Sequence, residues 1–169
     1  IETNVLARYI RLLQASTNPD LLTEKIDLNN LGFLFDEIDF SVEGALDSKE
    51  IAEAKQKTYF DLNVDSIKTP KFEKGLQLIR QLVSEGKKVL VWGMFVGTMR
   101  KIHQELNNAG IFSHLIYGAT PKDDRVDLIN EFRDGDVQVL ISNPATLGES
   151  ISLHQSVHDA VYFEYNFNL

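Results

Sequence analysis

The sequence contains no cysteine, so it offers neither a disulfide framework nor a thiolate metal site. It has no apolar run long enough to span a bilayer and no recognisable secretory leader. These absences predict a protein of the cytoplasm without membrane contact. The chain begins at Ile1 rather than at Met, so we expect it to be a piece of a longer protein.

Positive charge is scarce and unevenly placed. The net charge is −8: residues 1–69 carry 7 basic and 13 acidic side chains, residues 70–169 carry 10 and 12, and no Lys or Arg follows Arg133. Nucleic-acid binders usually present a basic face, so this balance argues against strong binding by the chain alone. It does not exclude a local groove that binds nucleic acid.

The chain is long enough for one globular domain with an appendage, since it has 169 residues of which 43% are hydrophobic and 25% charged. We predict that residues 1–69 form a mostly helical appendage. An amphipathic helix begins near Val5 and is broken at Asn18-Pro19. Asp47 and Glu50 resemble a capping box that opens a second helix.

Residues 70–169 alternate between helix and strand patterns. Short apolar strands are predicted over residues 88–92, 111–117, 137–142 and 160–164, and amphipathic helices separate the first three of them. Helical connections of this length predict right-handed βαβ crossovers and hence a parallel sheet. The predicted fold class is therefore α/β, with helices on both faces of the sheet.

Two of these helices are expected to begin at the same dipeptide. Thr69-Pro70 and Thr120-Pro121 would each supply a capping hydroxyl and a first helical residue. The second of these helices is expected to bury Val126, Ile129 and Phe132.

Glycines and hydroxyls gather where the predicted strands end. In open parallel sheets, ligands bind beyond the carboxyl ends of the strands. These ends lie at residues 92–94, 117–120, 142–144 and 164–166. We expect the loops 118–121 and 142–150 to lie side by side at this edge and to form one shared groove.

Three ordered segments carry a resemblance to a known family. KFEKGLQLIRQLVSEGKKVLVWGMFVGTMRKIHQEL is followed by HLIYGATPKDDRVDLINEFRDG and then by VQVLISNPATLGESISLHQSVHDAVYFEYNFN. In this order they resemble the second, C-terminal RecA-like lobe of Swi/Snf-type ATPases, which belong to the superfamily-two helicases and translocases. RLLQASTNPDLL, upstream, is similar to the family's L-R-x-x-x-x-H-P-x-L-L. The pattern N-P-A…G-E at residues 143–149 is similar to that of bacterial and phage-like relatives.

The resemblance implies a lobe of a nucleic-acid-dependent ATPase, a helicase-like DNA translocase, that contacts a strand backbone and forms one wall of an ATP cleft. Backbone phosphates are bound by N–H groups, hydroxyls and helix starts as well as by cations. The residues placed at nucleic acid are Gly93, Gly118, Ala119, Thr120, Arg125, Ser142 and Asn143. Those placed at the nucleotide are Gly148, Glu149 and Ser150.

The implied partners are double-stranded DNA and the N-terminal RecA-like lobe of the same protein. ATP and Mg²⁺ are the implied cofactors of the full-length protein, and none is expected to bind tightly to this piece. The sequence has no G-x-x-x-x-G-K-[ST] loop to cradle phosphates. It also stops before the family's last motif, whose arginines stabilise the transferred phosphoryl group. We therefore expect no catalytic residue here and no ATP hydrolysis by the isolated chain.

Several positions depart from the family pattern. Gly93-Met94 stands where Ser or Thr and Gln are usual, and Ser150 and Ser152 replace a common glycine and asparagine. FEYNFN is similar to Y-D-x-x-W-N, with Glu164 for Asp and Phe167 for Trp.

Structural and non-catalytic interpretations of the same residues stay open at this point. The segment 142–150 could be a polar loop with local side-chain turns. The whole chain could be a non-catalytic α/β protein-interaction module that binds a partner through its acidic appendage. Trp92 is expected in the core rather than as a platform for a base. His154 and His158 have the i, i+4 spacing of a metal pair, but no third ligand is evident, so no metal site is predicted.

Overall fold

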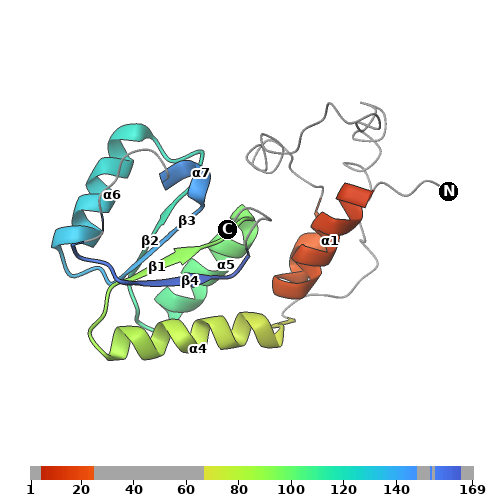
Figure 1. Ribbon diagram of the computed structural model, residues 1–169, viewed down its shortest axis with the longest axis horizontal. Coiled ribbons are helices and arrows are strands. Elements are labelled where there is room, and N and C mark those ends of the chain that lie inside the picture. The colour runs from red at the N-terminus through yellow and green to blue at the C-terminus, as the bar shows by residue number, and fades with distance from the viewer. Residues whose placement is uncertain (1–4, 25–66, 148–152, 154, 165–169) are drawn as a thin grey trace. The chain divides into compact units, whose positions relative to one another are not determined.

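The computed structural model describes residues 5–24, 67–147, 153 and 155–164 (Figure 1). Its contacts divide the chain into two compact units, Ile1–Thr69 and Pro70–Leu169. The helix predicted from Asp47 and Glu50 lies outside the described residues. Within the described parts of the chain, no helix is both long and apolar enough to cross a membrane.

The second unit is built on a four-stranded parallel sheet. Its strands are β1 (Val89–Trp92), β2 (Ser113–Ile116), β3 (Val139–Ser142) and β4 (Asp159–Tyr162). Their order across the sheet is β2-β3-β1-β4, and every pairing is parallel. This arrangement confirms the predicted α/β fold, because α5 and α6 form the helical crossovers that parallel pairing requires between β1, β2 and β3.

Helices cover both faces of this sheet. They are α4 (Pro70–Ser84), α5 (Val96–Asn108), α6 (Lys122–Asp134) and the short α7 (Pro144–Leu147). Residues of α4 and α5 share one apolar cluster with the sheet, and residues of α6 and α7 share another. The central strand β3 is buried on both sides, which explains why it reads as a continuous apolar run, whereas Ala160 and Tyr162 of the edge strand β4 are exposed.

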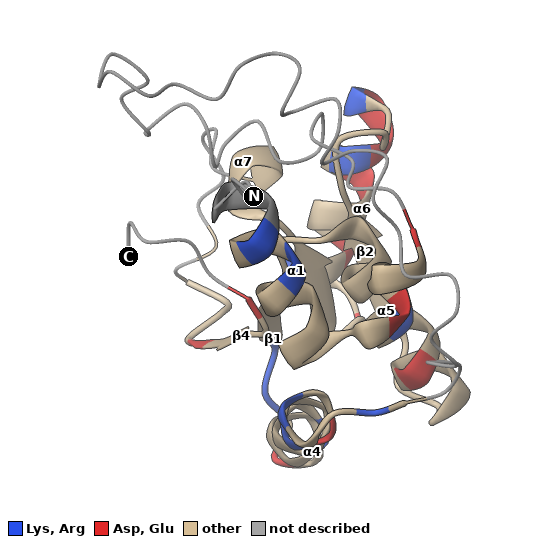
Figure 2. Ribbon diagram, turned by 90° about the vertical axis from the view of Figure 1, so that its right-hand side faces the viewer, with Lys and Arg blue, Asp and Glu red and all other residues tan. Residues whose placement is uncertain are grey.

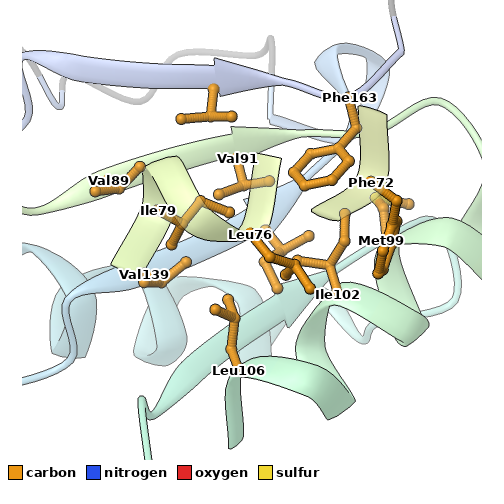
Figure 3. Packing of buried hydrophobic residues seen from close by; sticks show 12 residues of the cluster. Phe72, Leu76, Ile79, Val89, Val91, Met99, Ile102, Leu106, Val139 and Phe163 are labelled. Atoms are coloured by element: carbon orange, nitrogen blue, oxygen red, sulfur yellow. The ribbon is translucent and has the colours of Figure 1, made fainter. Parts of the chain in front are cut away.

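The larger apolar cluster forms because helix residues repeat every three or four positions and strand residues every second position on the face that each element buries. Helix residues at three- and four-residue spacing meet alternate residues of the strands, as Figure 3 shows. Its helical members are Phe72, Leu76 and Ile79 of α4 with Met99, Ile102 and Leu106 of α5, and its strand members include Val89, Val91, Val139 and Ile141. The ring of Phe163, just after β4, packs edge-on against Phe72 with ring centroids 5.6 Å apart.

The smaller cluster corrects one prediction for α6. Ile129 and Phe132 are buried against the sheet as expected, but Val126 is 57% exposed. The helix turns a stripe through Leu128, Ile129 and Phe132 towards the sheet, and Val126 lies to one side of that stripe. Periodicity alone could not decide which of the neighbouring apolar residues faced inwards.

The first unit contains α1 (Val5–Thr17) and a 3₁₀ turn, η1 (Pro19–Thr23). The break at Asn18-Pro19 is thus observed. The buried guanidinium of Arg11 joins the two elements, because it donates to the carbonyls of Leu21 and Glu24, each at 2.7 Å. The rest of the predicted helical appendage falls outside the described residues.

Candidate functional site

The four strands end at one level. Trp92 pairs with Ser142 and Tyr162, and Ile116 pairs with Ser142, so the last residues of the strands lie in register. The segments that follow all leave from this carboxyl edge (Figure 1). Since β2 and β3 are neighbours, the turn after β2 and the start of the loop after β3 emerge side by side.

The turn after β2 is closed by its own threonine. Thr120 N–H donates to the carbonyl of Tyr117 at 2.9 Å, and Thr120 Oγ1 accepts from Tyr117 N–H at 3.1 Å. The expected cap of α6 by Thr120 is therefore wrong. Pro121 occupies the N-cap position without a side-chain bond, and the helix begins one residue later, at Lys122. The Thr120 hydroxyl instead accepts the N–H of Tyr117, which follows β2.

Arg125 braces the same turn from the helix side. Its Nε donates to the carbonyl of Thr120 at 2.8 Å and its Nη2 to the carbonyl of Gly118 at 2.9 Å. Gly118 and Ala119 between these bonds are exposed. The arrangement holds a short exposed stretch of backbone in one conformation. This stretch lies at the carboxyl edge, shortly before the start of α6 at Lys122.

Arg100 is a residue that the sequence analysis missed. From α5 it donates through Nη2 to the hydroxyl of Tyr117 at 2.9 Å, and its guanidinium lies 5.2 Å from the centre of that ring. Such a cation–π contact adds a modest attraction. No local motif pointed to Arg100, because only the packing of α5 beside β2 brings it to the edge.

Ser142 and Asn143 use their side chains within the fold. Ser142 is 0% exposed, and its hydroxyl donates to the carbonyl of Ile116 at 2.7 Å. Asn143 is 5% exposed, and its Oδ1 accepts from Thr146 N–H at 2.8 Å, which is an N-cap for α7. These bonds fix how the chain leaves β3, while the assignment of both residues to nucleic acid stays a prediction.

Gly93 lies buried at the end of β1. Its N–H donates to the carbonyl of Ser142 at 3.0 Å. A Cβ at this position would lie 2.6 Å from Cγ of Met99, so the close packing of α5 leaves room only for glycine. Trp92 is partly buried against the smaller cluster, with its ring 6.4 Å from that of Tyr162. This position agrees with the predicted core role of Trp92.

Glu164 is the buried charge of this edge. It is 3% exposed, and its Oε2 accepts from Met94 N–H at 3.0 Å. Burial raises the pKa of the carboxyl to about 6, although the Met94 N–H, the Thr98 hydroxyl and Lys71 each lower it. The sequence showed only that Glu164 stands where Asp is usual, and no sequence pattern predicted that this carboxyl is buried.

The predicted nucleotide residues Gly148, Glu149 and Ser150 lie outside the described residues, as does His154. In the described ranges no group of three or more His, Cys, Asp or Glu side chains could hold a metal ion. Figure 2 shows both basic and acidic residues on α6, so this helix does not carry charge of a single sign.

Residues 70–166 match the family described as the helicase conserved C-terminal domain, which is more than half of the chain. A comparison with curated proteins finds no match. Among solved structures, the C-terminal part of the Fun30 ATPase domain has a TM-score of 0.62 and 18% identity, over 94% of this chain and 58% of that one. The SWI2/SNF2 ATPase C-terminal domain of Sulfolobus solfataricus has a TM-score of 0.54 and 19% identity, over 80% and 64%.

The Hef helicase domain of Pyrococcus furiosus gives a TM-score of 0.52 with 21% identity, over 95% of this chain and 34% of that one. At such identities the likeness concerns the fold. The chain spans 58% and 64% of the length of the first two structures that it matches.

Proposed function

Because the chain belongs to the family of helicase conserved C-terminal domains, we propose that it is the second lobe of a nucleic-acid-dependent ATPase that translocates on double-stranded DNA. In this proposal the carboxyl edge of the sheet contacts the backbone of one strand. The segment at residues 148–150 contributes one wall of an ATP cleft. A first lobe of the same protein completes that cleft and supplies the loop that cradles phosphates.

The braced turn at Gly118–Thr120 is the observation that carries the proposal. Nucleic-acid backbones are bound largely through backbone N–H groups and helix starts as well as through cations. Here two exposed residues are held rigid by Arg125 and Thr120, directly before α6. A rigid turn loses little conformational freedom when a phosphate binds, which favours binding. The remaining N–H groups of the guanidinium would strengthen the attraction.

Ser142 and Asn143 remain proposed nucleic-acid residues, and they have a second part in this proposal. Their side chains shape the exit of the chain from β3, beside the braced turn. They would keep the two loops in register for a strand that crosses both. ATP and Mg²⁺ are the proposed cofactors of the full-length protein, and Gly148, Glu149 and Ser150 remain the proposed nucleotide residues of this lobe.

ATP hydrolysis tests the proposal at the level of activity. We expect the 169-residue chain to release no phosphate from ATP, with or without DNA, because its sequence has no phosphate-cradling loop. The full-length protein that contains this chain is expected to hydrolyse ATP and to be stimulated by duplex DNA. Single-stranded DNA and RNA of matched length serve as comparisons.

Turnover by the chain alone would contradict the assignment of the phosphate loop to a missing lobe. A full-length protein that hydrolyses no ATP with any nucleic acid would instead favour the non-catalytic interaction module.

A further inference from the structure

The loop that joins β1 to α5 is held by a carboxyl from another strand. Glu164 follows β4, and its Oε2 accepts the N–H of Met94, which belongs to the segment between Trp92 and Val96. Both residues are buried, with Glu164 3% and Met94 2% exposed. The two segments are 70 residues apart in sequence, so this contact ties the end of one edge strand to the end of a central one.

The surroundings of this carboxyl leave it under-satisfied. Neither Glu164 Oε1 nor the buried Thr98 Oγ1 has a hydrogen-bond partner of normal geometry among the described residues, although Thr98 is close enough to lower the pKa of Glu164. Gly93 leaves the space that the arrangement needs, since its missing Cβ would meet Met99. Burying a charge with so few partners is costly, so this carboxyl is an unusual choice for a purely structural position.

We propose that Glu164 is a positioning residue for the β1–α5 loop, which sets the backbone of residues 93–95 at the edge that faces nucleic acid. This inference rests on the proposed function, because it assigns a purpose to the position of that loop. Glu164 itself touches neither nucleic acid nor nucleotide. It acts through Met94, whose N–H donates to Glu164 Oε2 at 3.0 Å.

The hydrogen bond between Glu164 and Met94 depends on whether Glu164 is ionised. An ionised carboxylate accepts N–H groups more strongly than a neutral carboxyl does. The pKa of Glu164 is about 6, raised chiefly by burial, so the hold on Met94 is strongest above that pH and weakens below it. Around the carboxyl, Lys71 of α4 is the charged side chain that favours ionisation, while Thr98 of α5 and the N–H groups of Met94 and Phe95 are neutral.

The amide of Met94 tests the positioning directly, by nuclear magnetic resonance of the whole chain. We expect its proton signal to titrate with a midpoint near pH 6 in the wild-type chain. Glu164→Gln should abolish that titration. Glu85→Gln is the matched control, because it removes the same charge from an exposed residue after α4, and it should leave the Met94 titration intact. Glu164→Asp, which keeps the charge, should retain a titration.

Binding of a fluorescent duplex DNA tests the connection to nucleic acid. Near pH 8 we expect Glu164→Gln to bind about three- to tenfold more weakly than Glu85→Gln, the net effect of one ordinary hydrogen bond. Near pH 5 the difference should shrink, because the wild-type carboxyl is then also neutral.

A wild-type Met94 signal that does not titrate near pH 6, or one that titrates equally in Glu164→Gln, overturns the positioning. Equal binding by the two variants near pH 8 overturns its connection to nucleic acid. If no variant binds DNA at any pH, the proposed function fails, while the Met94 titration still decides whether Glu164 positions the loop.

Discussion

Three polar side chains at the carboxyl edge bind backbone groups of the protein itself. Arg125 holds the turn after β2, Ser142 binds the last carbonyl of β2, and Glu164 binds the loop after β1. Residue types alone indicated a polar edge but not these partners, because each bond joins segments that only the folded sheet brings together. The sequence therefore predicted that these residues lie at the carboxyl edge of the sheet, but not which backbone groups their side chains bind.

Ser142→Ala is expected to destabilise the second unit by about 1 kcal/mol, since it removes the donor of a fully buried hydrogen bond. Ser84→Ala is the control, because the Ser84 hydroxyl makes a comparable bond at an exposed position and its loss should change stability by less than about 0.5 kcal/mol. Urea unfolding followed by the emission of Trp92, the single tryptophan, measures both. Equal effects of the two substitutions would show that burial of the Ser142 bond is unimportant.

Glu164 predicts how stability depends on pH. The folded pKa of about 6 lies above the ordinary value of 4.5, so the folded chain binds this proton more tightly than the unfolded chain does. The proton on Glu164 therefore stabilises the folded chain, and this stabilisation is fully present below pH 4.5 and is lost as the pH rises through 6. Ionisation of Glu164 then costs about 2 kcal/mol of unfolding free energy at neutral pH, on the conversion of about 1.4 kcal/mol per pKa unit.

Glu164→Gln removes this dependence. The unfolding free energy of Glu164→Gln minus that of wild type should rise by about 2 kcal/mol from acid to neutral pH. A difference that stays constant with pH would contradict the raised pKa of Glu164.

At the scale of elements, the sequence patterns predicted correctly those strands and helices whose position does not depend on contacts with distant residues. The four strands and α4 were found where apolar runs and helical spacing placed them, because their burial follows from their own sequence. The start of α6 and the exposure of Val126 were predicted wrongly. In both cases the outcome depends on neighbours in space: Thr120 bonds to the end of β2, and the sheet selects one stripe of α6.

The packing of α4 on β4 gives a prediction at this scale. A Cβ on Gly75 would lie 2.4 Å from Cζ of Phe163, so the ring occupies the space that glycine leaves. Gly75→Ala should destabilise the second unit by about 1–3 kcal/mol through overpacking, although alanine favours helix by about 1 kcal/mol. Chemical unfolding measures the change.

Phe163→Leu tests whether Gly75→Ala destabilises the protein by overpacking against the Phe163 ring. In a double-mutant cycle, Gly75→Ala should cost less in the Phe163→Leu background than in the wild type, because the smaller side chain relieves the clash. Additive effects would show that Gly75 and Phe163 do not share this contact.

At the scale of the whole molecule, ordered motifs predicted more than composition did. The net charge of −8 gave no sign of a nucleic-acid protein. The family match over residues 70–166 confirms the recognition of a helicase C-terminal domain, and the likeness to the C-terminal parts of the Fun30 and SWI2/SNF2 ATPase domains confirms its RecA-like fold. The parallel sheet brings the turn after β2 and the start of the loop after β3 to one edge, whereas the nucleotide residues lie outside the described part of the chain.

The central claim is that the braced turn contacts a nucleic-acid backbone, and the salt dependence of DNA binding tests it most directly. Arg125→Gln and Arg133→Gln remove one positive charge from the same helix, but only Arg125 holds the turn, since Arg133 pairs with Asp134 in solvent. We expect weak binding by wild type, with a dissociation constant of roughly 10⁻⁴ to 10⁻⁶ M that rises with salt. Arg125→Gln should bind about five- to tenfold more weakly, with a shallower salt slope, and Arg133→Gln should stay close to wild type. Equal binding and equal salt slopes for the two variants would contradict the contact.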